Sequence, residues 1–151
     1  MEQVLEAVKS YILDKYNELV EELSEPDIPL VPVDERSVIV GEIDLDKNTF
    51  SHCISIMPVS EEYEGLSLGS NEARLQLEIY IFVRKANPKL LFQQAQRLGQ
   101  IMKQVIYNDE TLGGVVEDTT VNRLEVFFGV EGSNEIQAVM LELTLIYEEQ
   151  M

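Results

Sequence analysis

The strongest constraint on the fold is a pair of strand patterns joined by a short loop. Residues 112–147 read LGGVVEDTTVNRLEVFFGVEGSNEIQAVMLELTLIY, with a glycine turn at 111–114, a strand over 115–128, a loop over 129–135 and a second strand. The second strand alternates, and one of its faces carries Val139, Leu141, Leu143, Leu145 and Tyr147. Consecutive strands usually pair, so the pattern predicts an antiparallel hairpin. A bulge is expected over 118–121, where the alternation of the first strand breaks.

Further strands are indicated earlier in the sequence. Residues 74–83 alternate strictly, residues 51–57 alternate more briefly, and residues 38–40 form a short apolar run before Gly41. The stretch SEEYEGLSLGSN at 60–71 is acidic, polar and glycine-bearing, and it reads as a long mobile loop. Residues 42–49 read as a turn because of their DLDKN core.

Two helices are expected from the 3.6-residue period. The first covers residues 2–23 and ends before Pro26, because proline cannot continue a helix. The second begins at Pro88, capped by Asn87, and runs to about Tyr107. Its buried stripe is predicted to consist of Leu91, Ala95, Leu98, Met102 and Val105.

These elements predict one domain over residues 1–151, since 151 residues are enough to bury a core without disulfides. It comprises an N-terminal helix at 3–24, a proline-rich connector at 25–36, and the sheet with the second helix at 38–148. We expect an α+β fold: a mixed, mostly antiparallel sheet of about four to five strands with two helices packed on one face.

Composition narrows the expected partners and compartment. The net charge of -17 repels phosphate backbones, so no sequence-specific nucleic-acid binding is expected. The single cysteine cannot form an internal disulfide, and the sequence begins without a signal peptide, which favours a reducing cytoplasm. No apolar run approaches the ~20 residues of a membrane span, so no membrane partner is expected.

The sequence offers little chemistry. His52 and Cys53 are neighbours on one strand and therefore point to opposite faces, which argues against a nucleophilic dyad. Acidic pairs are frequent among 28 Asp and Glu residues and carry no information about a metal. We therefore predict no enzymatic activity, no catalytic residue, no cofactor and no metal site.

Two surface features suggest assembly instead. If helices cover one face of the sheet, the other face presents Tyr80, Phe82, Met140 and Ile146, which either loops and the connector cover or a second subunit does. Residues 74–107 hold six basic and one acidic side chain. That segment is either an ordinary solvated face or a basic surface that meets an acidic surface of the next copy.

Four segments together carry a resemblance to a known family: VLEAVKSYILDKY, ARLQLEIYIFV, LFQQAQRLGQIMKQVIYNDETLGG, and the closing pair VNRLEVFFG and AVMLELTLIYEE. The layout resembles phage and prophage tail-terminator or tail-completion proteins, the head–tail joining or minor tail proteins. The resemblance implies a ring, commonly a hexamer, that caps the tail tube and joins tail to head. The partners it implies are further copies of the same chain, the tail tube and head–tail connector proteins. The location it implies is the bacterial host cytoplasm during assembly and then the virion.

The charges of the side chains suggest which residues form the contact between neighbouring subunits. One side is predicted to comprise Arg84, Lys85, Lys89, Arg97 and Lys103. Glu18, Glu21 and Glu22 are candidates for the other side of a head-to-tail interface. The loop at 60–71 would become ordered on meeting a tube or connector protein. The alternative function is a small regulatory or ligand-binding α+β domain without catalytic activity, with a metabolite on the open face of the sheet.

Overall fold

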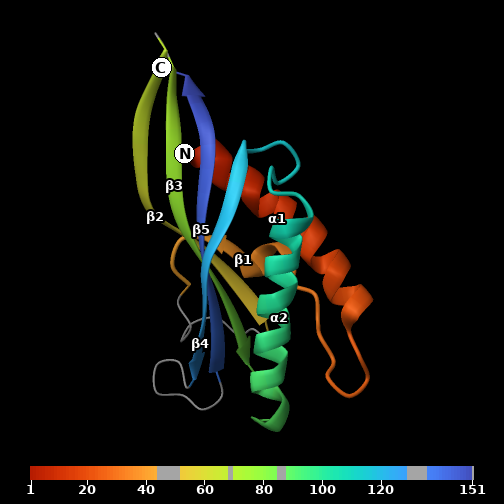
Figure 1. Cartoon of the computed structure of the whole chain (residues 1–151). Helices are drawn as coiled ribbons and strands as arrows, with labels where there is room; N and C mark the ends of the chain where they lie inside the picture. Colours follow the sequence, from red (N-terminus) through yellow and green to blue (C-terminus); the bar gives the residue numbers. More distant parts are fainter. Residues whose placement is uncertain (44–51, 68–69, 85–87, 129–135, 151) are drawn as a thin grey trace.

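The computed structural model describes residues 1–43, 52–67, 70–84, 88–128 and 136–150. Its elements follow in the order α1 (Glu2–Leu23), the short 3₁₀ turn η1 (Glu35–Ser37), β1 (Val38–Val40), β2 (His52–Ser67), β3 (Ser70–Arg84), α2 (Pro88–Asn108), β4 (Asp118–Phe128) and β5 (Ile136–Gln150). The described residues form one five-stranded sheet with α1 and α2 against it (Figure 1). The α+β class predicted from the sequence is confirmed.

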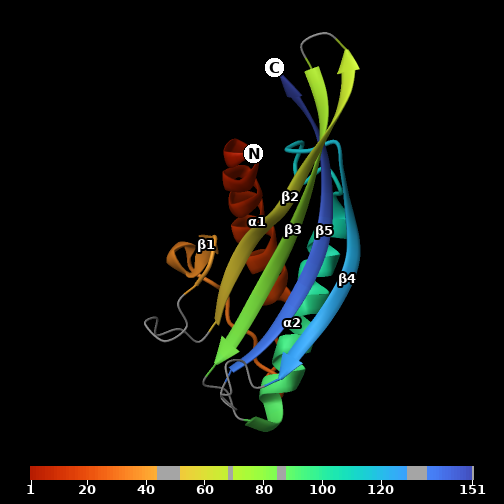
Figure 2. The same cartoon turned by 90° about the vertical axis from the view of Figure 1, so that its left-hand side faces the viewer.

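The strand order β1-β2-β3-β5-β4 makes the sheet mixed but mostly antiparallel, as predicted. Only β1 and β2 are parallel, and the other three pairs are antiparallel. β5 lies between β3 and β4, so it is a central strand although it comes last in the sequence. When the sheet is viewed from its open side, both helices lie behind it (Figure 2).

The core lies between the helices and the inner face of the sheet. The predicted stripe of α2 is buried throughout, and α1 contributes Leu5, Val8, Ile12, Tyr16 and Val20 at helical spacing. Opposite them stand the alternating residues of β3 and β5, paired as Leu77 with Leu143 and Ile79 with Leu141. The predicted inner face of β5 is therefore confirmed.

Gly99 lets α2 approach the sheet closely. A Cβ at this position would lie 2.6 Å from Cγ1 of Val139 on β5, far inside normal contact distance. Glycine costs a helix about 1 kcal/mol relative to alanine. The closer packing of α2 on the central strand is the structural reason that a glycine occupies the middle of this helix.

The proline-rich connector packs on its own subunit through side chains from three elements. Asn17 of α1 binds both backbone groups of Val33, donating to its oxygen at 2.7 Å and accepting from its nitrogen at 2.9 Å. Gln94 of α2 donates to the Pro29 oxygen at 2.6 Å. His52 of β2 contacts the backbone further along. The connector is therefore a structural strap across α1, α2 and β2.

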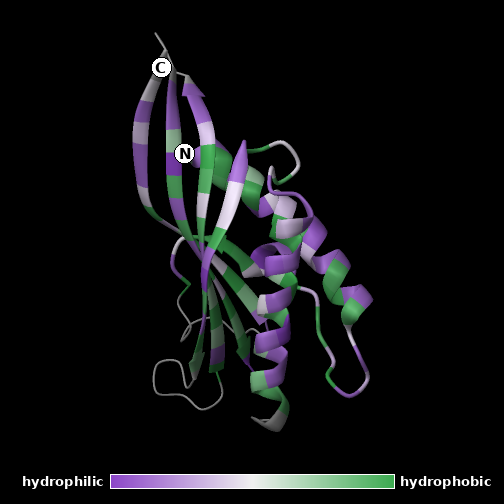
Figure 3. Cartoon of the chain, viewed as in Figure 1, coloured by the Kyte–Doolittle hydropathy of each residue, from purple (hydrophilic) through white to green (hydrophobic). Residues whose placement is uncertain are grey.

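One prediction about this fold is wrong. Residues 60–67 and 70–71 do not form a mobile loop: they extend β2 and β3, which pair as far as Ser67 with Ser70. Together with the end of β5, these strand ends run beyond both helices (Figures 1 and 2). We call residues 60–67, 70–75 and 147–150 the arm. Polar residues dominate it (Figure 3), although Ala73, Leu75 and Tyr147 at its base are buried in the main core.

Smaller differences concern element boundaries. β4 begins at Asp118 rather than at residue 115, and its register shift lies between Val121 and Arg123, just after the predicted bulge. Three further predictions fall outside the described residues: most of the turn at 42–49, the loop at 129–135 and the Asn87 cap.

Candidate functional site

Three aromatic rings form a cluster on the open face of the sheet, which we call the aromatic patch. Tyr80 lies between the other two rings, with centroid distances of 6.0 Å to Phe82 and 6.3 Å to Phe127. Tyr80 and Phe82 are half-buried, while Phe127 is 38% exposed. The Tyr80 hydroxyl donates to Glu78 at 3.2 Å, and partial burial together with this carboxylate raises the pKa of Tyr80. The patch is apolar with an acidic border.

Met140 is not part of that exposed surface, contrary to the sequence-based expectation. Its side chain is only 1% exposed, because β5 is a central strand and Met140 stands directly between Tyr80 on β3 and Glu125 on β4. Alternation gives the direction of a side chain but not what covers it. Ile146, between Arg74 and Asp118, is half-buried.

Phe82 also borders a second, small core on the open face. It packs with Ile43 against the buried residues Cys53 and Ile136. Ile43, three residues after β1, thus covers one end of this face. The expectation that loops might cover the outward apolar residues is met here, while Phe127 remains exposed.

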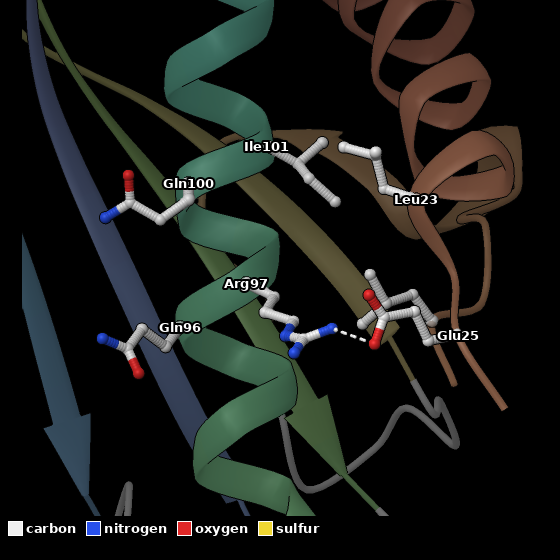
Figure 4. Close-up of a pocket in the computed structure, with 7 residues that line it drawn as sticks. Leu23, Glu25, Gln96, Arg97, Gln100 and Ile101 are labelled. Atoms are coloured by element: carbon white, nitrogen blue, oxygen red, sulfur yellow. Dashed lines mark ion pairs between the residues drawn. The ribbon is translucent and has the colours of Figure 1, made fainter. Parts of the chain in front are cut away.

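A second surface is the groove between the end of α1, the connector and α2, with a volume of about 340 Å³ (Figure 4). We call it the α2 groove. Leu23 and Ile101 face each other across it, and Leu30 lies among its lining residues. Nη1 of Arg97 binds Oε2 of Glu25 at 3.1 Å, with the two side chains 40% and 59% exposed. The groove therefore combines an apolar lining with one accessible ion pair.

The other predicted cations are not gathered into one cluster in the described part of the chain. The ammonium of Lys103 lies 5.7 Å from the ring centre of Tyr107. Arg84 ends β3, where its charge acts on Cys53 against the stronger effect of burial, which raises the pKa of that thiol to about 12. Lys85 and the side chain of Lys89 are not described.

The acidic candidates on α1 face solvent. Glu18, Glu21 and Glu22 are all exposed, and Glu18 lies 3.9 Å from the ammonium of Lys15. Exposed ion pairs of this kind contribute about 0–1 kcal/mol to stability. These carboxylates are therefore available to a partner at little cost.

His52 has a structural environment. Its Nδ1 donates to the Val31 oxygen at 2.8 Å, which leaves Nε2 to accept from the Tyr16 hydroxyl, also at 2.8 Å. Burial lowers the pKa of His52 to about 4, so the ring is neutral at pH 7. The imidazole of His52, on β2, links the connector to α1, so its role is structural.

The arm presents charged and aromatic side chains that the sequence reading assigned to a loop. Tyr147 donates to Oε1 of Glu61 at 2.8 Å, linking β5 to β2. Tyr63 is 56% exposed, and its hydrogen bond to Glu61 is the main cause that raises its pKa to about 12. Glu62 and Glu64 beside it are exposed. The arm is thus an ordered acidic projection.

The described residues hold neither a cluster suited to a metal ion nor a helix that could span a membrane. Within residues 1–43, 52–67, 70–84, 88–128 and 136–150, no group of three or more His, Cys, Asp or Glu is placed to hold a metal ion. None of the helices in these ranges is long and apolar enough to cross a membrane. The aromatic patch, the α2 groove and the arm are the features that a function must explain.

Sequence comparison identifies no family for this chain. No protein-family model matches it, and no curated protein matches it either. The three surfaces therefore carry the functional argument.

Proposed function

We propose that the chain is a structural protein of the phage neck or tail, which assembles as a ring, commonly a hexamer, caps the tail tube and joins tail to head. The observation that carries the proposal is the aromatic patch on the sheet face that the chain's own helices leave open. Burying it against a second copy would remove apolar area from water, at about 25 cal/mol per Å².

The distribution of charge supports a contact between unlike surfaces. α2 contains three basic residues and no Asp or Glu among its 21 residues, whereas the 22-residue α1 contains six acids. In a chain of net charge -17, such a helix is suited to an acidic neighbour. Contacts between unlike surfaces close into rings when the rotation between subunits allows it.

The partners follow from the same proposal. One rim of the ring would meet the tail tube and the other the head–tail connector proteins. The acidic surplus would let DNA pass through the ring without adhering to it. Assembly would take place in the bacterial host cytoplasm, and the protein would remain in the virion. In this role the protein needs no catalytic residue, cofactor or metal.

The test is the size and shape of the purified protein, measured by light scattering coupled to gel filtration and by negative-stain microscopy, with and without isolated tail tubes. Rings, free or at tube ends, are the expected result. Phe127→Ser should reduce assembly because it removes the exposed ring of the patch. Val31→Ser is the control, since Val31 is 56% exposed but lies on the connector, outside the patch and α2.

Monomers under all conditions, with no binding to tubes, would refute the proposal. A monomer whose melting temperature rises with a small molecule would favour the regulatory or ligand-binding alternative instead. Equal effects of the Phe127 and Val31 variants would show that the aromatic patch has no special part in assembly.

A further inference from the structure

We infer that Arg97 in the α2 groove is the docking point for a carboxylate on the arm of a second copy, and that Glu25 occupies this point in the free subunit. The inference rests on the proposed ring and specifies its contact. It joins two features found in every copy: a groove that holds an exchangeable ion pair and an acidic arm that projects beyond the helices.

The ion pair in the groove is exchangeable because both partners reach solvent. The guanidinium of Arg97 is held by one carboxylate oxygen of Glu25 at 3.1 Å, and the two side chains are 40% and 59% exposed. An exposed pair of this kind changes an equilibrium constant by at most about fivefold. Replacing Glu25 by a carboxylate from another chain therefore costs little, and Arg97 stays paired in both states.

The α2 side of the groove favours an incoming acid. α2 carries no carboxylate of its own, so nothing on the helix repels an acidic segment. Leu23, Leu30 and Ile101 give the groove an apolar lining. Leu23 is 46% exposed in the free subunit and would be covered by a bound segment.

The arm supplies matching groups. Glu62 and Glu64 are exposed and share one face of β2, while Tyr63 between them is 56% exposed and points to the other face. Two carboxylates on one face of a strand suit a groove with a single exposed cation. The Tyr147 to Glu61 hydrogen bond and the pairing of β2, β3 and β5 fix the arm before binding, so docking orders little additional chain.

The open strand edges of the sheet disfavour edge-to-edge pairing between copies, which leaves contacts between side chains. In the described part of the structure, β1 pairs with only three residues of β2, so the rest of β2 has an open edge. β4 is the last strand of the sheet and has the other open edge. Pro58 and two register shifts interrupt β2, and a further shift interrupts β4. Proline and bulges at edges are the features that prevent strand addition.

The position of the two surfaces makes the contact intermolecular. The arm lies at the end of the sheet where the C-terminus is drawn, whereas the groove lies where α1 ends (Figure 1). One subunit cannot fill its own groove with its own arm. Each copy instead offers one arm and one groove, which is the head-to-tail arrangement that a ring requires.

The decisive experiment is sedimentation velocity on the full chain and on two single variants, Glu25→Gln and Arg97→Gln, over a range of concentrations. If the inference is right, the two variants act in opposite directions. Glu25→Gln frees Arg97 and should strengthen self-association by up to about fivefold. Arg97→Gln removes the docking charge and should weaken self-association by about tenfold. If the pair served only subunit stability, both variants would have the same small effect.

Matched controls come from two neighbouring exposed residues of η1. Glu35→Gln and Arg36→Gln make the same changes of charge outside the groove and should leave association unchanged. Combining Glu62→Gln and Glu64→Gln should weaken association in the wild-type background but have little further effect with Arg97→Gln. Thermal melting of each variant confirms that the subunit is folded.

The outcomes separate the two proposals. Association that is unaffected by the groove and arm variants, or shifted the same way by Glu25→Gln and Arg97→Gln, overturns the docking inference and leaves the ring standing. A wild-type chain that does not associate at any concentration or salt, even with tail tubes present, overturns both.

Discussion

The buried His52 provides the most quantitative prediction. Burial holds its folded-state pKa at about 4, against about 6.5 in an unfolded chain. Because the folded-state pKa is the lower one, the unfolded chain takes up a proton first as pH falls. The free energy of unfolding should therefore decrease as pH falls from above 6.5 towards 4.

The magnitude follows from the separation of the two pKa values. One pKa unit is worth about 1.36 kcal/mol, so His52 accounts for about 3.4 kcal/mol over the whole range. At pH 5.5, one unit below the unfolded pKa, about 1.4 kcal/mol of this is lost. The experiment compares the free energy of unfolding in urea of wild type and His52→Gln at pH 7.5 and 5.5. Both proteins have the same carboxylates, so the pH-dependent contribution of these groups cancels in the difference. Wild type should lose about 1.4 kcal/mol more than the variant.

A direct measurement accompanies the unfolding experiment. The chain has one histidine, so its ring protons give a single set of NMR signals that can be followed with pH. In the folded protein these signals should titrate near pH 4. Titration near 6.5 would refute the argument, because it would mean that the ring is hydrated in the folded state. A pH-independent difference between wild type and His52→Gln would refute it as well.

Three further substitutions test the packing, each by urea unfolding at pH 7.5. Gly99→Ala should destabilise by about 1–3 kcal/mol, because its Cβ would meet Val139 at 2.6 Å, and a second change, Val139→Ala, should recover part of that loss. Asn17→Ala should cost about 1–3 kcal/mol by leaving both backbone groups of Val33 without their partner. Tyr16→Phe should cost a similar amount, about 1–3 kcal/mol, since Nε2 of His52 loses its donor.

The sequence predicted well those elements whose periodicity reflects a single buried face. α1 and α2 were found because each packs one stripe against the sheet, and β5 because its inner residues all enter the same core. The two-residue and 3.6-residue periods record which side of an element is buried. Where only one side is buried, the pattern suffices.

The arm was missed for the complementary reason. Residues 60–67 lie beyond the helices, so neither face has to be apolar and the alternation disappears. What holds them is backbone pairing with β3, which leaves no mark on residue type. A polar strand paired with an ordered neighbour therefore looks like a loop in the sequence.

The candidate contact residues also show that local patterns can be found in the sequence, whereas long-range contacts cannot. Arg97 could be proposed from charge, but its partner Glu25 lies 72 positions away in the sequence, and only the fold brings the two together. Met140 was expected at the surface because its direction was known and its neighbours were not. The strap contacts of Asn17, Gln94 and His52 likewise depend on distant backbone groups that no local pattern reveals.

The place of β5 in the sheet has a consequence for synthesis. β4 does not pair with β3, and both strands pair with β5, so a ribosome-bound chain that stops before Ile136 has an incomplete sheet. Until β5 emerges, β3 lacks its second neighbour in the sheet, and α2 lacks the strand it contacts most. The nascent chain therefore passes through a period with exposed apolar surface, in which chaperones would bind it. The fifteen residues of β5 turn that intermediate into the native subunit.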